Sequence, residues 1–273
     1  MRHALKLDDA GMHRLEAIYL CPEMVSQRCE IVERLNLEAG EHVLDIGCGP
    51  GFLAAEIARQ VGPGGQVRGI DYSQPVLEMA RHRCADLEGT SFEGAFASEL
   101  PYVNERFDVG VASQVYGYLH DVEHAIAELY RVLRPGGRAL ILETDWGSLV
   151  WHAANQERMR RVLSAWNQHE THPDLPRRLS PMLLRAGFEI VERTVFPLFN
   201  PEFSEQAYCH GLMDAIRSFV PGRERLSEAE VEAWEQEQRE LGRNGEFFFS
   251  VNRYLFLVSR PDLVTHCGPD THQ

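Results

Sequence analysis

The sequence predicts an α/β fold built on a doubly wound, mostly parallel sheet of seven strands. Three observations predict it. Short apolar runs alternate with amphipathic helical runs from Val43 onward, and this alternation implies right-handed crossovers between parallel strands. A glycine-rich turn, GCGPG at residues 47–51, joins the first strand to the first helix. The alternation stops after Thr144, so additional helices precede the last strands.

The expected strands and helices follow in a fixed order along the chain. Each strand is a short apolar run, and each helix repeats apolar residues at three- and four-residue steps. Pro75 suits the first turn of a helix, and RPGG at 134–137 separates a helix from a strand. Strands are expected at 43–46, 67–71, 90–94, 107–113, 139–144, 189–196 and 247–259. Helices are expected at 52–61, 75–84, 122–133, 155–167 and 181–186.

Two helical segments stand outside this alternation. Residues 12–35 carry apolar positions at helical spacing around a break at Pro22, and they precede the first strand as a lid would. Residues 201–244 are expected to hold inserted helices, one of them starting with a capping box at 227–230. The predicted organisation is lid helices at 1–40, a core at 41–200, a helical cap at 201–244, the last core strand at 245–260 and a flexible tail at 261–273.

Composition and charge narrow the function classes. The 273 residues fit one large α/β domain with additions, and a hydrophobic content of 44% is far from that of disordered chains. A net charge of −14 argues against a nucleic-acid partner. No signal-peptide core or membrane-length apolar run occurs, so we expect a soluble cytoplasmic protein without a membrane partner. These features leave the oligomeric state open.

The glycine-rich turn predicts a small-molecule site at the carboxyl end of the sheet. A turn of this kind brings backbone N–H groups and a helix N-terminus against a ligand. Gly47, Gly49 and Gly51 follow the pattern GxGxG, whereas a dinucleotide fingerprint needs a further glycine where Phe52 stands. The loop therefore fits a ligand without a pyrophosphate, which disfavours a nicotinamide-dependent oxidoreductase.

Four segments carry a family resemblance. VLDIGCGPG at 43–51 closely resembles the first motif of class I S-adenosylmethionine-dependent methyltransferases, and GIDYSQPVLEMAR at 69–81 looks like the second. ELPYVNERFDVGVAS at 99–113 and ELYRVLRPGGRALIL at 128–142 look like the later motifs. The resemblance covers about residues 41–145 and is closest to the branch of ubiquinone and menaquinone methyltransferases. It implies a Rossmann-like core, S-adenosylmethionine as cofactor and S-adenosylhomocysteine as product.

The resemblance also implies which residues hold the cofactor. The glycine loop, including Cys48, would line the methionine end, and Asp71 would accept hydrogen bonds from both ribose hydroxyls, which suits a carboxylate. Tyr19 and Arg28 of the lid are expected near the cofactor carboxylate. The remaining expected cofactor contacts are Asp45, whose alternative role is to orient the loop, and Ser113 and Gln114.

The adenine end departs from the family pattern. Many relatives carry an acid four residues before the leucine of an LP pair, but this chain has Phe96 at that place. Phe96 and Tyr72 are expected to stack on the adenine, with the backbone near Ala97 reading its edge. The alternative is that both rings belong to the hydrophobic core.

Methyl transfer is an in-line displacement, so alignment and the exclusion of water supply much of the catalysis. A base is needed only when the methyl acceptor carries a proton. His120, in the loop after the fourth strand, is the first candidate for that base, and Asp145 and His152 at the end of the fifth strand are the second choice. The aromatic residues expected to line the acceptor pocket are Tyr116, Tyr118, Trp146 and Trp151.

The predicted activity is transfer of a methyl group to O, N or C of a small aromatic or apolar metabolite, with O-methylation of a hydroxylated aromatic favoured. The nucleic-acid branch of the family carries (N/D)PP(Y/F) after the fourth strand, whereas this chain has SQVY at 113–116. No metal is expected, because the histidines of HETHPD at 169–174 lack an obvious third ligand. The alternative is a non-catalytic protein that binds S-adenosylmethionine or serves as an interaction partner.

Overall fold

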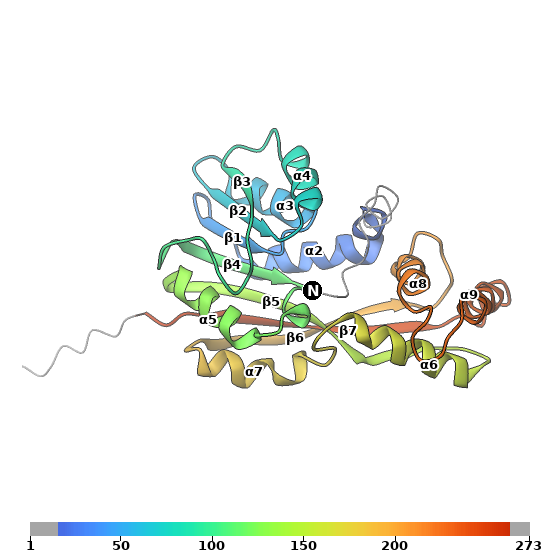
Figure 1. The fold of residues 1–273 in the computed structure, drawn as a ribbon. Coiled ribbons are helices and arrows are strands. Elements are labelled where there is room, and N and C mark those ends of the chain that lie inside the picture. Colours follow the sequence, from blue (N-terminus) through green and yellow to red (C-terminus); the bar gives the residue numbers. More distant parts are fainter. Residues whose placement is uncertain (1–15, 263–273) are drawn as a thin grey trace, which may run out of the picture.

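A computed structural model describes residues 16–262, and a seven-stranded sheet forms its centre (Figure 1). The strand order is β3-β2-β1-β4-β5-β7-β6, in which β1 to β5 pair in parallel and β7 is antiparallel to both of its neighbours. The predicted sheet is therefore confirmed. The strands are β1 (His42–Ile46), β2 (Gln66–Asp71), β3 (Thr90–Gly94), β4 (Phe107–Ser113), β5 (Leu133–Trp151), β6 (Glu189–Asn200) and β7 (Phe249–Ser259).

The helices occur where the apolar periodicity predicts them. Residues 16–20 are helical, and Pro22 begins the next helix; the rest of the predicted first helix lies outside the described residues. The predicted capping box is present, because Ser227 and Glu230 each bond the other's backbone N–H. The helices are α2 (Pro22–Leu35), α3 (Phe52–Val61), α4 (Gln74–Arg83), α5 (Val122–Val132), α6 (Gln156–Trp166), α7 (Pro176–Arg185), α8 (Tyr208–Phe219) and α9 (Glu228–Arg243), with 3₁₀ turns η1 (Tyr116–Tyr118) and η2 (Asn167–His169).

Several predicted boundaries were wrong. The fifth strand begins at Leu133 and so includes the RPGG segment expected to precede it, and β6 continues past the expected end at residue 196 to Asn200. The fifth strand was expected to end at Thr144, but β5 continues to Trp151 because β7 pairs with it as far as Phe249, across a bulge after Asp145. The helix expected at 181–186 corresponds to α7, and it was expected to start at Pro181. It begins at Pro176 instead, since a proline is tolerated in the first helical turn and the four-residue step from Leu179 to Leu183 buries one face.

Alternate residues of the strands pack into two separate hydrophobic cores, one on each face of the sheet. In β1, Val43 faces the core under α2, α3 and α4, whereas Leu44 faces the core under α5 and α7. Because β1 and β4, in the middle of the parallel part of the sheet, are covered on both faces, most of their residues are buried. The carboxyl ends of β1, β2 and β4 remain free to hold a ligand, as is usual for this type of sheet.

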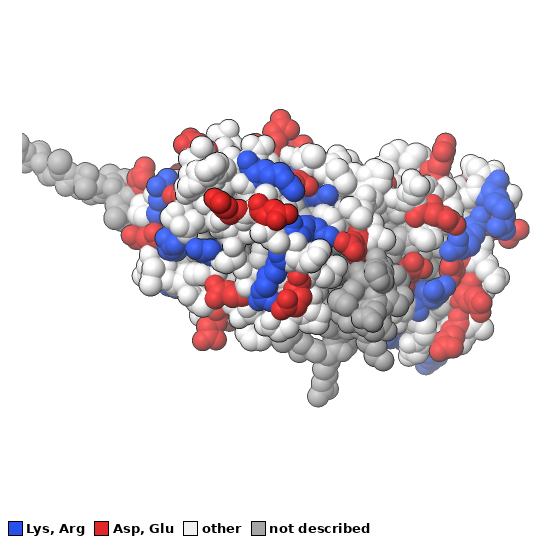
Figure 2. Space-filling view, turned by 90° about the horizontal axis from the view of Figure 1, so that it is seen from above, with Lys and Arg blue, Asp and Glu red and all other residues white. Residues whose placement is uncertain are grey.

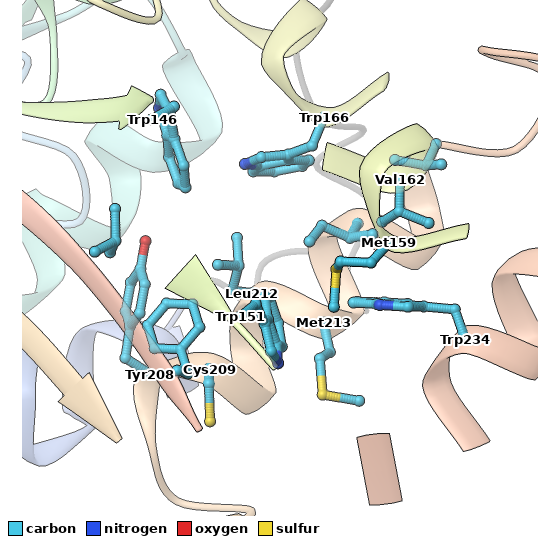
Figure 3. Close-up of a cluster of buried hydrophobic side chains, with 14 of the residues drawn as sticks. Trp146, Trp151, Met159, Val162, Trp166, Tyr208, Cys209, Leu212, Met213 and Trp234 are labelled. Atoms are coloured by element: carbon cyan, nitrogen blue, oxygen red, sulfur yellow. The ribbon is translucent and has the colours of Figure 1, made fainter. Parts of the chain in front are cut away.

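A third core lies beyond the parallel part of the sheet. The long β5, β6 and β7 extend past the ends of β1 to β4, and α6, α8 and α9 gather around that extension (Figure 1). All four tryptophans of the chain, Trp146, Trp151, Trp166 and Trp234, belong to this core, together with Met159, Met213 and Phe249 (Figure 3). We call this core, together with α6, α8 and α9 around it, the cap.

The described surface carries charges of both signs. On the face in Figure 2, basic and acidic side chains are interspersed among uncharged ones. Within residues 16–262, no helix combines the length and apolar character needed to cross a membrane.

Candidate active site

The glycine loop between β1 and α3, here called the cradle, packs too closely against its neighbours to carry side chains. Gly47, Gly49 and Gly51 all have positive φ angles, which other residues rarely adopt. A Cβ atom on Gly47 would lie 2.3 Å from Cγ2 of Val115, and one on Gly51 would lie 2.9 Å from the Cα of Ala80. A Cβ on Gly49 would lie 2.9 Å from the Tyr19 hydroxyl. Both the backbone conformation and the close packing therefore require glycine at these three positions.

Asp71 ends β2 directly beside this cradle. Its Oδ2 accepts a hydrogen bond from the Gly49 N–H at 3.2 Å, and its Oδ1 accepts one from the Ser73 N–H at 2.9 Å. These bonds fix the carboxylate while leaving lone pairs on both oxygens. The predicted ribose-binding acid is thus held in place by the loop that the cofactor would touch.

Asp45 lies in β1 just before the loop, and Cys48 belongs to the loop itself. Asp45 is 2% exposed, and its Oδ2 has no hydrogen-bond partner among the described residues. Burial, with the nearby charge of Asp71, raises the pKa of Asp45 to about 7. The Cys48 side chain is buried, and its backbone N–H donates to the Ile70 carbonyl at 2.9 Å. An unpaired buried acid beside the glycine loop fits S-adenosylmethionine, because the amino group of that cofactor is a cationic donor.

The lid residue Tyr19 reaches the loop because Phe52 supports it. The two rings stack with 5.5 Å between centroids, and the Arg83 guanidinium covers the same Phe52 ring at 3.5 Å. The predicted lid partner Arg28 is buried; it pairs with Glu56 at 2.8 Å and donates to the Tyr19 carbonyl at 2.6 Å. Its donors are therefore directed at the lid and α3, so we keep Tyr19 and leave Arg28 out of the proposed cofactor contacts.

Two aromatic side chains stand exposed at the adenine side. Tyr72, just after β2, is 52% exposed, and Phe96 is 51% exposed, whereas the neighbouring Ala97 is buried. The Ala95 N–H donates to the Asp71 carbonyl at 3.2 Å, which joins the two segments. Neither ring belongs to the hydrophobic core, so the core alternative for this pair was wrong.

The ends of β4 and β5 are joined by a polar network. Gln114 has a φ angle of 60° and donates from Nε2 to the Leu142 carbonyl at 3.2 Å, and it accepts from the Thr144 hydroxyl at 2.5 Å. Ser113 accepts from Nε2 of Gln27 in α2 at 3.4 Å. The buried Arg253 of β7 donates to Thr144 and to Gln27. The two predicted cofactor residues thus stand where the lid meets the strand ends.

The predicted acceptor residues separate into two groups. Tyr118 is 48% exposed, and its ring lies edge-on to His169 with centroids 5.9 Å apart. Trp146 is buried, 5.0 Å from the same histidine ring. Tyr116 is fully buried, and Trp151 packs 4.8 Å from Phe249 inside the cap. We therefore leave Tyr116 and Trp151 out of the proposed pocket, because their rings fill cores.

The structure gives no support to the three predicted bases. His120 is exposed on the loop before α5. Both oxygens of Asp145 bond to Arg177, at 2.8 and 2.9 Å, so that this acid ties β5 to α7. His152 is exposed beyond the end of β5, and its N–H donates to the Phe248 carbonyl. The longer β5 is the reason that Asp145 and His152 do not flank one strand end.

Glu143 and Glu170 were missed from the sequence. Glu143 is 1% exposed and accepts from the N–H groups of Val115, Tyr116 and Gly117 at 3.0, 2.7 and 3.4 Å. Burial and then the charge of Glu170 raise its pKa to about 8. Glu170 belongs to the HETHPD segment, whose histidines were considered only as possible metal ligands. Among the described residues no group of three potential ligands forms a metal site.

Comparison with known proteins agrees with this site. A family described as a methyltransferase domain matches residues 37–187, more than half of the chain. A demethylmenaquinone methyltransferase from Oceanobacillus iheyensis is 30% identical over 185 residues, covering 61% of this chain and 77% of that protein. A 37.1 kDa protein of transposon TN4556 from Streptomyces fradiae is 35% identical over 178 residues, covering 63% of this chain but only 50% of its relative.

A solved structure shows the same fold. Phosphoethanolamine N-methyltransferase 2 from Haemonchus contortus, in complex with S-adenosyl-L-methionine, superposes with a TM-score of 0.61 at 19% identity, covering 93% of this chain and 58% of that chain. The family match, the relative from Oceanobacillus and the glycine loop beside Asp71 lead to one assignment. The chain belongs to the class I S-adenosylmethionine-dependent methyltransferases, in the branch of the menaquinone methyltransferases, and S-adenosylmethionine is its cofactor.

Proposed function

We propose that the protein transfers the methyl group of S-adenosylmethionine to a small acceptor with an aromatic or apolar body, and that this acceptor binds beside Tyr118. The observation that carries the proposal is the position of Tyr118. Its half-exposed ring lies edge-on to the ring of His169, with 5.9 Å between centroids, and its carbonyl accepts a hydrogen bond from the Thr171 hydroxyl at 3.1 Å. The preceding residue, Gly117, lies against the buried carboxylates of Glu170 and Glu143, so an accessible aromatic ring directly follows a residue that contacts two buried acids.

The chain supplies binding and enclosure for this reaction. When bound, S-adenosylmethionine supplies an electrophilic methyl group on a sulfonium. Asp71 would hold the ribose hydroxyls, Asp45 would accept from the amino group, and Tyr72 and Phe96 would stack on the adenine. Tyr19 lies over the glycine loop, so that it would cover the methionine end and exclude water from the methyl group.

The class of acceptor has separate support. Tyr118 offers an accessible ring, and Trp146 and Tyr208 lie in the cap core (Figure 3). The relative from Oceanobacillus is named as a demethylmenaquinone methyltransferase. We favour O-methylation of a hydroxylated aromatic, because the carboxylates of Glu170 and Glu143 lie beside Gly117, the residue before Tyr118.

Calorimetry and turnover test the proposal together. We expect S-adenosylmethionine and S-adenosylhomocysteine to bind and NAD not to bind, and we expect S-adenosylhomocysteine to be released when a panel of hydroxylated aromatics is added, as measured by mass spectrometry. Asp71→Ala should abolish turnover at low cofactor concentration, whereas Asp86→Ala, an exposed acid beyond α4, should not. Tight cofactor binding without a methylated product from any small acceptor would instead favour the non-catalytic alternative.

A further inference from the structure

Two buried carboxylates from distant segments meet beside Gly117. A Cβ atom on Gly117 would lie 2.5 Å from Oε2 of Glu170 and 3.5 Å from Oε2 of Glu143. Glu143 is 1% exposed and Glu170 is 8% exposed, and neither has an arginine or lysine within ion-pair distance among the described residues. Burying two negative charges without a cation is costly. The pair therefore requires a proton or a ligand that donates hydrogen bonds.

The two carboxylates differ in how they are bonded. Oε1 of Glu143 accepts the N–H groups of Val115 and Tyr116, while its Oε2 has one long contact, at 3.4 Å to the Gly117 N–H. Burial and the charge of Glu170 raise the pKa of Glu143 to about 8, so Glu143 carries a proton at neutral pH. The less engaged Oε2, on the side of Glu170, is the atom that suits this proton.

The carboxylate of Glu170 can still accept hydrogen bonds from a ligand. Among the described residues, its carboxylate lies 3.4 Å from Nε2 of His169, which is longer than a normal charged hydrogen bond. The other ring nitrogen of His169, Nδ1, lies 2.5 Å from the Trp166 carbonyl, and its Nε2 is buried without a hydrogen-bond partner among the described residues. A buried acid and an unpaired buried nitrogen thus lie together, and the ring that carries this nitrogen is 5.9 Å from that of Tyr118.

The pair also lies close to the site of methyl transfer. The Val115 side chain packs closely against Gly47 of the glycine loop. Gly117, two residues further along the chain, packs closely against the Glu170 carboxylate. Two residues of chain span at most about 7 Å, so one short loop contacts both the cofactor cradle and Glu170.

We propose that Glu170 removes the proton from a hydroxyl group of the acceptor, and that the protein therefore methylates hydroxylated acceptors on oxygen. This inference rests on the proposed methyltransferase function. The acceptor oxygen forms its bond to the methyl carbon while the bond from that carbon to the sulfonium sulfur breaks; the hydroxyl proton passes to Glu170, and the sulfonium becomes a neutral thioether. Glu143 acts as a positioning residue, since its proton offsets the second buried charge and its N–H bonds fix the loop that carries Tyr118.

Spectroscopy of a bound phenol tests this role without turnover. The protein, saturated with S-adenosylhomocysteine, is titrated with 4-nitrophenol, whose absorbance reports its ionisation. We expect the bound phenol to ionise at a higher pH than free phenol, because the Glu170 carboxylate accepts its proton in a hydrogen bond and repels the phenolate. In Glu170→Gln the midpoint should fall by about one pH unit or more, whereas Glu88→Gln, which changes an exposed acid, should leave it unchanged.

Turnover with two phenols gives a second measurement. At mildly alkaline pH, 4-nitrophenol is largely ionised and needs no base, while 4-methoxyphenol keeps its proton. Glu170→Gln should slow methylation of 4-methoxyphenol by about 10²- to 10⁴-fold and that of 4-nitrophenol by less than about tenfold. Glu170→Asp, which retains a carboxylate, should recover part of the lost rate, and unchanged melting temperatures would show that both variants fold.

Three outcomes would overturn the inference. Equal ionisation midpoints in wild type and Glu170→Gln would show that the carboxylate does not meet the phenol. Equal losses for both phenols would assign Glu170 to binding or folding. If the wild type binds S-adenosylhomocysteine but neither phenol, the hydroxyl acceptor class and the role of Glu170 are refuted, while the proposed transfer to another small acceptor still stands.

Discussion

The ring of Tyr19 lies parallel to the ring of Phe52, with 9° between their planes and 5.5 Å between their centroids. Phe52 occupies the place where a dinucleotide-binding loop would have its third glycine. We therefore expect Phe52 to disfavour a dinucleotide, and the same ring supports Tyr19, the proposed cover of the methionine end of S-adenosylmethionine. Arg83 lies over this ring as well, so Phe52 is fixed against α4.

Phe52→Ala should weaken binding of S-adenosylhomocysteine by about 1–2 kcal/mol, because Tyr19 loses the surface on which it stacks. Isothermal calorimetry measures this directly. Phe248→Ala is the matched control, since Phe248 is a partly exposed aromatic just before β7 that packs against another ring, that of Phe199. Hydrogen exchange adds a structural measurement: amides in residues 16–35 should gain less protection on cofactor binding in Phe52→Ala than in the wild type. Equal affinity and equal protection would show that the stack only fills space.

Asp71→Ala should weaken S-adenosylmethionine binding by about 1–3 kcal/mol, because charge-assisted hydrogen bonds to two ribose hydroxyls disappear. The same change removes the acceptor for the Gly49 and Ser73 N–H groups, so the loop must be checked separately. Asp71→Asn keeps one acceptor oxygen and should lose less affinity than the alanine variant. Wild-type calorimetric affinity in a folded Asp71→Ala protein would contradict the assignment.

Phe96→Ala should lower cofactor affinity by about 1–3 kcal/mol, the cost of losing one aromatic ring stacked on a base. Phe96→Tyr should retain nearly full affinity, because the stacking face remains. Since Phe96 is half-exposed, neither variant should change the melting temperature of the free protein by much. A lower melting temperature combined with normal affinity would mean that the ring serves the fold and not the adenine.

Local patterns account for what the sequence could predict. Apolar alternation located all seven strands, and the GxGxG turn with Asp71 at the next strand end located the cofactor site, because these features depend on residues close together in the chain. The family resemblance added the identity of the cofactor. The predicted bounds of the strands and helices agree best with the observed ones where the chain is most regular, as at β3, β4 and α3.

Long-range pairing explains what the sequence could not predict. The extension of β5 to Trp151 depends on β7, which is far away in the chain, and that extension separates Asp145 from His152. Arg177, on α7, occupies both oxygens of Asp145. Glu143 and Glu170 meet only because the loop after α6 returns to Gly117. Neither acid carries a local motif for this role, so burial was the signal needed to find them.

Asp45 provides the last prediction, which concerns pH. Burial raises its pKa from 3.8 to about 7, so the folded state binds this proton more tightly than the unfolded state does. The resulting contribution to stability is fully present below about pH 4 and is lost as the pH rises through about 7. Asp45→Asn keeps the shape of the side chain but cannot ionise, and it should therefore remove this loss.

Urea unfolding of the cofactor-free protein between pH 4 and pH 9 measures the effect. The variant should match the wild type near pH 4 and exceed it by about 1–4 kcal/mol above pH 8, the upper value being the full difference between the two pKa values. Binding of S-adenosylmethionine should show the opposite preference, because its cationic amino group needs the carboxylate that asparagine lacks. Near pH 6, wild-type binding should also release a proton, which calorimetry in buffers of different ionisation enthalpy detects. Parallel stability curves for the two proteins would mean that Asp45 is already ionised in the free protein, and its unpaired oxygen would then need another partner.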